Sequence, residues 1–235
     1  MRITTILSCI LLLLAVSTPS ALQAIENPVV DLGTGYAMEG SRVVDVHTSN
    51  SGDVLTIVGK VVGFKDPFSD LDPMDPTKEY TYVYSGLVSS GTAVSGSGSF
   101  IFYTTPYAGG ELKIYCDTAQ NADFANQSTF SDGDMILSAD LSNTILETKS
   151  FNCAGNHNSD FVFTGGSLFN RVSDNGNGFT GIVTGLFSVC ASAVEPDRQA
   201  EGYFGRSDTK MDVDPPVAVN PLRWGEIKKE LRPGR

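Results

Sequence analysis

The sequence predicts an all-β protein, with an antiparallel β-sandwich of about ten strands as the first choice and a closed barrel as the second. Short apolar runs recur along the chain, and Gly-, Ser-, Asn- and Asp-rich turn signals such as "SGSGS", "YAGG", "SDGD" and "DNGNG" separate them. Helical periodicity is almost absent before Val219. About 210 residues after export suit one such domain.

The stretch 111–118, "ELKIYCDT", shows the clearest strand pattern. Leu112, Ile114 and Cys116 fall on one face, so this face is expected to contact the core and the other to meet solvent. Residues 53–64 carry apolar residues on both faces, which predicts a strand with neighbours on each side. The other predicted strands cover residues 41–46, 79–88, 98–107, 134–141, 144–151, 159–166, 181–192 and 201–207.

The N-terminus has the pattern of an export signal. Arg2 precedes the apolar run "ILSCILLLLAV", and the small-residue stretch "STPSALQA" follows it. Cleavage is expected after Ala24, with Ala21 as the alternative. Because Thr18, Pro19 and Ser20 interrupt the run early, no membrane span is expected after cleavage. The protein is therefore expected to be secreted or displayed at the cell surface.

The C-terminal tail is the exception to the β pattern. Asn220 can cap a helix, Pro221 suits its first position, and Trp224, Ile227 and Leu231 form one apolar stripe. A helix of about eleven residues is marginal alone, so the stripe is expected to dock on its own domain or on a partner. The expected organisation is a signal peptide over 1–24, a lead-in over 25–40, the β domain over 41–214, and a proline-rich linker with the helical tail over 215–235.

The charge of the chain excludes one class of function. After removal of residues 1–24, 15 basic residues face 27 acidic ones, a net charge of −12. Such a surface repels phosphate backbones, so nucleic-acid binding is not expected. The segment from Leu222 to Arg235 carries +3 and residues 25–221 carry −15, which predicts attraction between the tail and the acidic body.

Three cysteines remain after export: Cys116, Cys153 and Cys190. An odd number cannot pair fully within one chain, so one disulfide and one buried thiol are expected in an oxidising compartment. Cys153 lies in the turn-like stretch "NCAGNHN" and could pair with either of the others. The sequence leaves the pairing open.

An acidic, proline-rich loop is the candidate metal site. Asp66, Asp70, Asp72 and Asp75 fall within ten residues and offer the hard oxygen ligands that calcium prefers. The loop lacks the spacing, glycine and closing glutamate of an EF-hand, and the alternative is a solvated loop stiffened by proline. Calcium is the only cofactor that the sequence suggests.

Tyr80, Tyr82 and Tyr84 alternate along one predicted strand and form the candidate ligand-binding surface. Their rings could stack on sugars, although tyrosines that cover a sheet face, with their hydroxyl groups reaching solvent, are the preferred interpretation.

Catalytic motifs are not found. The chain has two histidines, and neither His47 nor His157 lies in a known nucleophile or zinc-ligand pattern. The stretch "GNHNSD" favours a polar surface turn for His157.

Two resemblances can be stated. The stretch "WGEIKKELR" (224–232) resembles a short Trp-Gly-x-Ile/Val-Lys element that ends many exported proteins of poorly characterised bacteria, with Leu231 where an aromatic residue is more usual. The stretches "EYTYVYSGLVSSGT", "GGELKIYCDTAQNADF" and "FVFTGGSLFNRV" are similar to uncharacterised exported bacterial β-rich proteins that form a domain of unknown function. This resemblance spans residues 79–172 and implies no catalytic residues.

These observations predict a secreted or cell-surface, non-enzymatic structural or binding module. Its partner would be a cell-surface glycan or another exported protein. One alternative is a calcium-assisted carbohydrate-binding module that uses the acidic loop and the tyrosines. The other is a hydrolase or isomerase with acidic residues in a barrel mouth, which requires a deep pocket with at least two converging carboxylates.

Overall fold

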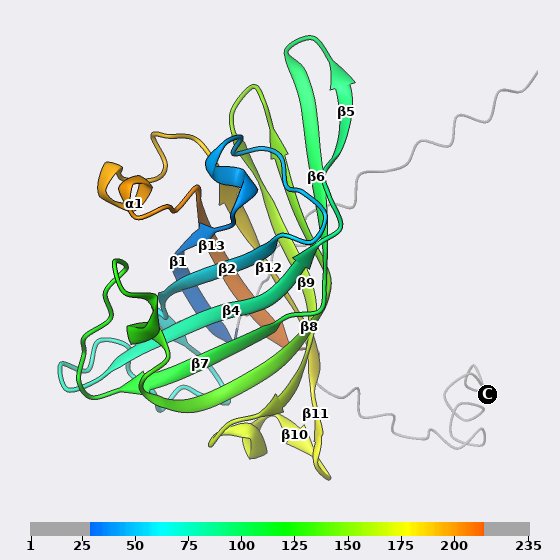
Figure 1. The fold of residues 1–235 in the computed structure, drawn as a ribbon. Helices are drawn as coiled ribbons and strands as arrows, with labels where there is room; N and C mark the ends of the chain where they lie inside the picture. Colours follow the sequence, from blue (N-terminus) through cyan, green and yellow to red (C-terminus); the bar gives the residue numbers. More distant parts are fainter. Residues whose placement is uncertain (1–28, 214–235) are drawn as a thin grey trace, which may run out of the picture.

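The computed structural model describes residues 29–213, and its regular structure is mostly β-strand (Figure 1). The helical segments are η1 (Ser41–Val43), η2 (Gln127–Phe130), η3 (Phe169–Arg171) and α1 (Pro196–Ala200). The strands are β1 (Val30–Met38), β2 (Val54–Lys60), β3 (Gly63–Phe64), β4 (Glu79–Ser89), β5 (Ala93–Ser97), β6 (Phe100–Ala108), β7 (Glu111–Asp117), β8 (Asp134–Lys149), β9 (Ala154–Gly165), β10 (Ser173–Asp174), β11 (Asn177–Gly178), β12 (Thr180–Ser188) and β13 (Gly205–Val213).

Eight strands close into an antiparallel barrel in the order β2-β1-β13-β12-β9-β8-β7-β4, and β4 pairs with β2. The barrel order follows the chain order, and closure occurs where the first strand, β1, pairs with the last, β13. The all-β prediction is confirmed in its second form, because the strands close into a barrel and do not separate into two sandwich layers. A barrel of eight strands has an interior that side chains can fill.

The longest strand, β8, pairs with two successive segments of the chain. Its first half pairs with β7 and its second half with β6. Gly109 and Gly110 separate β6 from β7, and their positive φ angles of 66° and 99° redirect the chain between the two segments. Beyond the barrel, β5 pairs with β6 to form a projecting hairpin (Figure 1).

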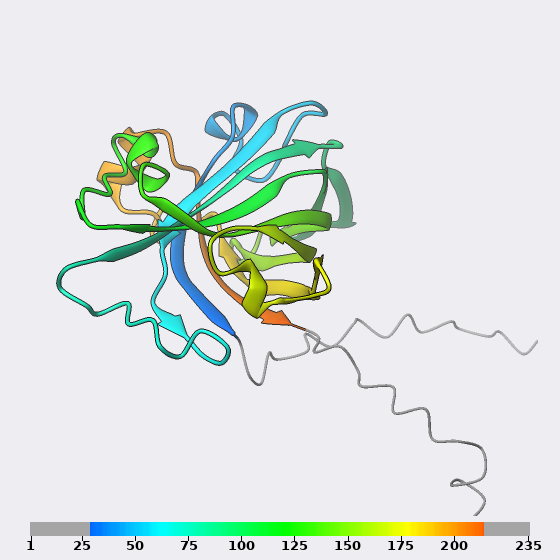
Figure 2. The same ribbon diagram turned by 90° about the horizontal axis from the view of Figure 1, so that it is seen from below.

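The two ends of the barrel carry different connections. The β1–β2, β8–β9 and β12–β13 connections lie at one end, and a disulfide between Cys153 and Cys190 joins two of them. We call this the disulfide end. The opposite end carries the β10–β11 hairpin (Figure 2) and both ends of the described chain, Val29 and Val213.

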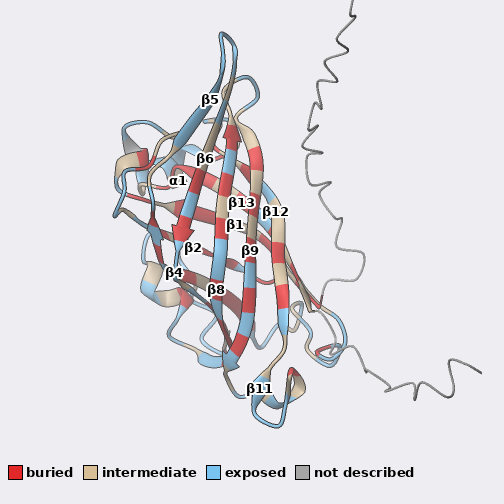
Figure 3. Ribbon diagram, turned by 90° about the vertical axis from the view of Figure 1, so that its right-hand side faces the viewer, coloured by how far each residue is buried: buried red, intermediate tan, exposed pale blue. Residues whose placement is uncertain are grey.

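Side chains from all eight strands fill the barrel interior. Buried and exposed residues alternate along β8 and β9 (Figure 3), as expected for strands with one face on the core. Away from the disulfide end the interior is apolar. The inward residues there include Tyr80, Ile114, Leu137, Phe161, Phe163, Val183 and Met211.

A second apolar cluster lies outside the barrel, where the β7–β8 and β12–β13 connections meet. Its buried members are Tyr36 from β1, Val58 from β2, Phe130 from η2, and Val194 and Tyr203 from the β12–β13 connection. The Tyr36 and Phe124 rings meet edge to face with centroids 4.9 Å apart. This cluster fixes both connections to the barrel wall.

Several predicted boundaries differ from the structure. The barrel begins with β1, inside the segment 25–40 that we expected to be a lead-in. The prediction of a strand over 41–46 is wrong, because the chain forms η1 there and buries the Arg42 side chain at the end of the barrel. The strands predicted over 134–141 and 144–151 are one strand, β8, in which Asn143 adopts a positive φ of 50° at a register shift. The "DNGNG" turn forms the β10–β11 hairpin.

The predicted signal peptide over 1–24 and the predicted helical tail with Trp224, Ile227 and Leu231 lie outside the described residues.

Candidate functional site

A pocket of about 320 Å³ lies at the disulfide end, between the β1–β2 connection and the β12–β13 connection. Its lining is mainly aliphatic and aromatic, with one cationic and one amide side chain, and contains no carboxylate. The lining residues are Arg42, Val46, Val189, Ala191, Val194, Gln199, Gly202, Tyr203 and Phe204. Pockets of this size and character are typical of sites for small molecules.

Arg42 is the buried cation of this pocket. It follows β1 by one short turn, and four of its five N–H groups have protein acceptors. Nε donates to Glu39 Oε2 at 3.0 Å, and Nη1 donates to the Val46 carbonyl at 2.9 Å. Nη2 donates to Thr105 Oγ1 at 2.9 Å and to the Tyr107 hydroxyl at 3.2 Å. Within the described part of the chain, the remaining Nη1 N–H has no acceptor.

Both oxygens of the Glu39 carboxylate accept hydrogen bonds. Oε2 accepts from Arg42 and from the Tyr107 hydroxyl, which lies 2.6 Å away. Oε1 accepts from the Ser49 hydroxyl, which lies 2.6 Å from Ser89 Oγ. Burial raises the pKa of Tyr107 well above its usual value, so this hydroxyl keeps its proton and remains a donor. A buried ion pair with this many hydrogen bonds is a rigid element, because loss of either partner leaves a buried charge.

Aromatic and aliphatic groups complete the surroundings of the guanidinium. The Arg42 guanidinium carbon lies 5.0 Å from the centre of the Phe204 ring, a cation–π distance. Phe204 also contacts Phe187 from β12, with ring centroids 5.9 Å apart. Arg42 is thus a lining residue of the pocket whose side chain is almost fully buried and held in one orientation.

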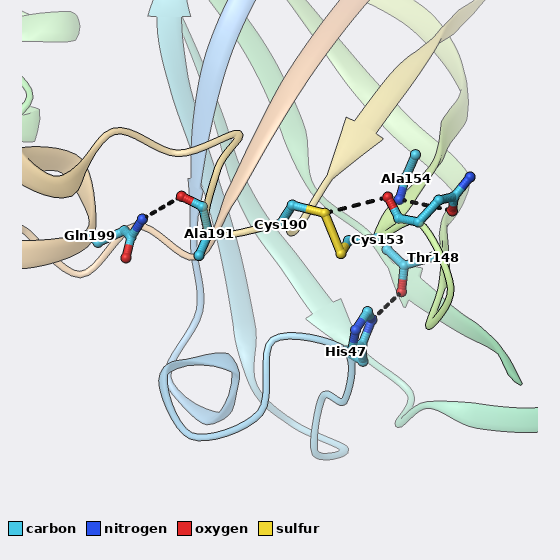
Figure 4. Close-up of a disulfide and its surroundings, with 8 residues drawn as sticks. His47, Thr148, Cys153, Ala154, Cys190, Ala191 and Gln199 are labelled. Carbon is cyan, nitrogen blue, oxygen red and sulfur yellow. Dashed lines mark hydrogen bonds between the residues drawn. A yellow bond between two sulfur atoms is a disulfide. The ribbon is translucent and has the colours of Figure 1, made fainter. Parts of the chain in front are cut away.

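The pocket wall contributed by the β12–β13 connection is held by covalent and polar contacts (Figure 4). The disulfide fixes Cys190 to Cys153, with Cα atoms 5.1 Å apart. Gln199 Nε2 donates to the carbonyl groups of Ala191 at 2.8 Å and Val194 at 2.6 Å. These contacts form the wall without a ligand, so the pocket is preorganised.

The outer side of the same connection is fixed by Tyr36. Its hydroxyl donates to Glu195 Oε2 at 2.6 Å, and burial together with this carboxylate raises the pKa of Tyr36 to about 12. The Tyr203 hydroxyl donates to the Phe124 carbonyl at 2.9 Å. Arg198 lies over the Phe124 ring at 4.4 Å. The connection is thus anchored on both of its sides.

The structure does not bring the four aspartates of the acidic loop together around one point. Asp70 binds Arg171 through both carboxylate oxygens, which lowers the pKa of Asp70. Asp66 Oδ1 accepts from Ser69, Asp72 Oδ1 from the Met74 amide, and Asp75 Oδ1 from Thr77. Among the residues 29–213, no three His, Cys, Asp or Glu side chains form a metal-binding group. Calcium binding stays a prediction without a donor cluster to support it.

The three candidate tyrosines point into the barrel. Tyr80, Tyr82 and Tyr84 are all buried, so they form no exposed stacking platform and their hydroxyl groups do not reach solvent. The Tyr82 hydroxyl lies over Gly35 and Gly59, 2.2 and 2.6 Å from where a Cβ would stand at each. These two glycines are therefore required by the close approach of the Tyr82 ring.

The structure also places the three candidate cysteines and the two histidines. The structure pairs Cys153 with Cys190 and leaves Cys116 as a half-buried free thiol. His47 stacks on Tyr103 with ring centroids 4.6 Å apart, and its Nδ1 lies 3.2 Å from Thr148 Oγ1. The expectation of a surface turn at His157 is wrong, because this residue lies inside the barrel on β9 and is fully buried.

His157 belongs to a polar layer of the interior that the sequence pattern did not indicate. Its Nε2 lies 3.1 Å from Ser159 Oγ, which lies 2.9 Å from Thr144 Oγ1. Burial lowers the pKa of His157 to about 4. The buried atoms His157 Nδ1, Tyr82 OH and Ser207 Oγ have no hydrogen-bond partner within the described chain. In the sequence, only the alternation of His157, Ser159 and Phe161 with more exposed residues could have indicated that His157 points into the barrel.

Glu79 and Asp117 are the other buried carboxylates among the described residues. They lie opposite each other on β4 and β7. Glu79 Oε2 pairs with Lys60 Nζ at 2.7 Å, and Glu79 Oε1 accepts from the Ala122 amide at 2.7 Å. Asp117 Oδ1 accepts from the Ala119 amide at 2.8 Å. Neither carboxylate lines the pocket.

No protein-family model matches the chain, and no curated protein or solved structure is significantly similar to it. None of the helices between residues 29 and 213 is long and apolar enough to span a membrane.

Proposed function

We propose that the protein is a secreted or cell-surface, non-enzymatic binding module that holds a small ligand in the pocket beside Arg42. The ligand is mainly apolar and carries one hydrogen-bond acceptor. The observation that carries this proposal is the preorganised pocket of about 320 Å³, which is lined by apolar side chains and by buried Arg42, whose guanidinium has one N–H without an acceptor among residues 29–213. The N-terminal export pattern and the disulfide support the exported location.

The chemistry of the walls sets the ligand class. The valine and phenylalanine side chains favour an apolar body, and Gln199 directs its amide N–H groups to the protein's own carbonyls. Glu39 balances the charge of Arg42, so a full negative charge on the ligand is not required. A neutral acceptor, such as an amide or hydroxyl oxygen, therefore suits the site as well as a carboxylate.

We do not propose the hydrolase or isomerase alternative, because it requires two carboxylates that converge in a pocket. The lining of this pocket has none, and Glu39 has donors on both oxygens. The carbohydrate alternative gains no support either, because Tyr80, Tyr82 and Tyr84 are buried.

Four aromatic probes of nearly equal size test the proposal: toluene, benzyl alcohol, benzamide and benzoate. An apolar cavity of about 150 Å³ is enough to bind benzene, so each probe can enter. We expect thermal-shift and calorimetric measurements to show binding of the three probes with an acceptor, and weaker binding of toluene. A ligand that binds only the folded protein raises its melting temperature by an amount that grows with the logarithm of the ratio of free ligand to Kd.

A blocking variant and its neighbour provide the control. Ala191 is exposed and lines the pocket, so Ala191→Trp should fill the entrance and abolish binding. Ser192 is exposed and does not line the pocket, so Ser192→Trp should bind like the wild type. The proposal is wrong if no probe binds, or if Ala191→Trp leaves binding unchanged.

A further inference from the structure

The projecting β5–β6 hairpin carries an unprotected strand edge. Within the described chain β5 pairs with β6 alone, and all five residues of β5 are exposed. Natural edge strands are usually protected by charged side chains, proline or a covering loop. The sequence of β5, "AVSGS", contains neither charge nor proline, and Gly96 keeps its place in the ladder to β6 with a positive φ of 93°. The backbone donors and acceptors of β5 that face away from β6 are therefore available for another strand.

An aromatic patch lies beside this edge. Phe100, Phe102 and Phe151 are 64%, 41% and 48% exposed. Phe151 contacts both of the others, with ring centroids 5.4 and 6.1 Å apart. Since a phenylalanine offers about 200 Å² of surface, the patch exposes about 300 Å² of apolar area. Contiguous exposed patches of this size are often interaction sites.

Charge restricts where two copies of this protein can meet. Residues 29–213 hold 10 basic and 23 acidic residues, a net charge of −13, so most approaches of two copies are repulsive. The stretch from Tyr80 to Gly110 has no Asp, Glu, Lys or Arg and includes the whole hairpin. The hairpin is thus a surface on which a second copy meets no like charge.

We propose that two copies of the chain associate through their β5 edges. An antiparallel strand edge is self-complementary about a two-fold axis, and the centre of β5 is Ser95. In the joined sheet both aromatic patches lie on the same side, and each is separated from the partner's β5 by its own β5, where Phe100 faces the small residue Ser97. Five-residue edges pair over an area well below about 1,200 Å², so the dimer is weak and concentration-dependent.

Sedimentation velocity of the full exported chain, from micromolar to millimolar concentration, tests this inference. We expect a reversible monomer–dimer equilibrium that strengthens with added salt, because salt screens the repulsion of the acidic bodies. Ser95→Lys and Ser95→Asp each place like charges opposite each other and should give monomers. An equimolar mixture of the two variants should restore the dimer, an outcome that misfolded variants cannot produce.

Two further variants complete the design. Phe100→Ser should weaken the dimer, whereas Leu186→Ser, which removes an equally exposed apolar side chain from β12, should not. A chain that stays monomeric at every concentration contradicts the inference. So does a dimer that Ser95→Lys leaves intact, or one that salt dissociates, since the latter indicates charge-driven contact elsewhere. Ala191→Trp should dimerise normally, which separates this inference from the proposed pocket.

Discussion

The two halves of the barrel interior are built from different chemistry. Away from the disulfide end, phenylalanine, leucine, isoleucine and valine side chains fill the interior. Toward the disulfide end, an ion pair, hydroxyl groups and a neutral histidine take their place. Burial of apolar area stabilises the first half, whereas the second depends on a hydrogen-bond network in which His157 Nδ1 and Ser207 Oγ have no partner among the described residues. The pocket that we propose as the binding site lies at the polar half.

The largest effect is expected when the buried ion pair is broken. Arg42→Ala leaves Glu39 buried without its cation, which should reduce the free energy of unfolding by about 3–5 kcal/mol. Phe163→Ala in the apolar half should cost a similar amount by leaving a cavity, about 3–5 kcal/mol. Urea denaturation measures both.

The double variant Glu39→Leu/Arg42→Met tests whether the polar half loses stability through the unpaired charge or through loss of the ion pair itself. Replacing both charges by apolar side chains of similar size should recover most of the stability lost in Arg42→Ala. It should also abolish binding of benzamide. A double variant as unstable as Arg42→Ala would show that the ion pair itself, and not the unpaired charge, determines stability.

Removal of the disulfide is the next largest change. Cys153→Ser/Cys190→Ser opens a link between residues that are 37 positions apart, which should lower stability by roughly 3–4 kcal/mol. Because Val189 and Ala191 flank Cys190 in the pocket wall, we also expect weaker binding of benzamide. Unchanged affinity in this variant, measured by calorimetry, would show that Gln199 and the Tyr36 contacts are sufficient to hold the wall.

His157 should make stability depend on pH. Its pKa is about 4 in the folded protein and 6.5 for the ordinary side chain, so the unfolded state binds more protons between these values. The stability supplied by neutral His157 is complete above pH 6.5 and is lost as pH falls toward 4. At 1.36 kcal/mol per pKa unit the loss is about 3 kcal/mol.

The variant His157→Gln provides the reference for this titration. The difference in unfolding free energy between wild type and His157→Gln should change with pH between 6.5 and 4, and should be constant above pH 7. A difference that does not vary with pH would mean that the imidazole is solvated or paired in the folded protein.

The smallest effect concerns the Tyr82 hydroxyl. This buried atom has no partner among the described residues, so Tyr82→Phe should leave stability unchanged or raise it by about 1 kcal/mol. Tyr84→Phe is the matched comparison, because the Tyr84 hydroxyl lies 3.5 Å from Thr209 Oγ1. A clear loss of stability in Tyr82→Phe alone would indicate a buried water between Tyr82 and a neighbour such as Ser207.

The strands that the sequence predicts best are those with strict alternation. The "ELKIYCDT" pattern gives β7 with the expected inward face, because only one of its faces meets the core. The choice between sandwich and barrel could not be made, since closure depends on β1, whose Gly33 and Gly35 interrupt its apolar pattern. Pairing of the first strand with the last is a long-range event without a local signal.

The site was harder to predict than the fold. Glu39 and Arg42 are three positions apart, a spacing that is common for exposed ion pairs, so nothing local indicates their burial. Their burial follows from Thr105, Tyr107 and Ser49, which are distant in the sequence. His157 was misjudged because polar neighbours that face outward on a strand have the composition of a turn.

The most direct test of the central claim is an NMR titration with benzamide that follows the Arg42 side-chain Nε–H signal and the Val189 and Val194 methyl signals. The pocket beside Arg42 predicts saturable shifts of all three signals, and none of them in Ala191→Trp. Shifts confined to other parts of the barrel, with Arg42, Val189 and Val194 unmoved, would contradict the assignment of this pocket as the binding site.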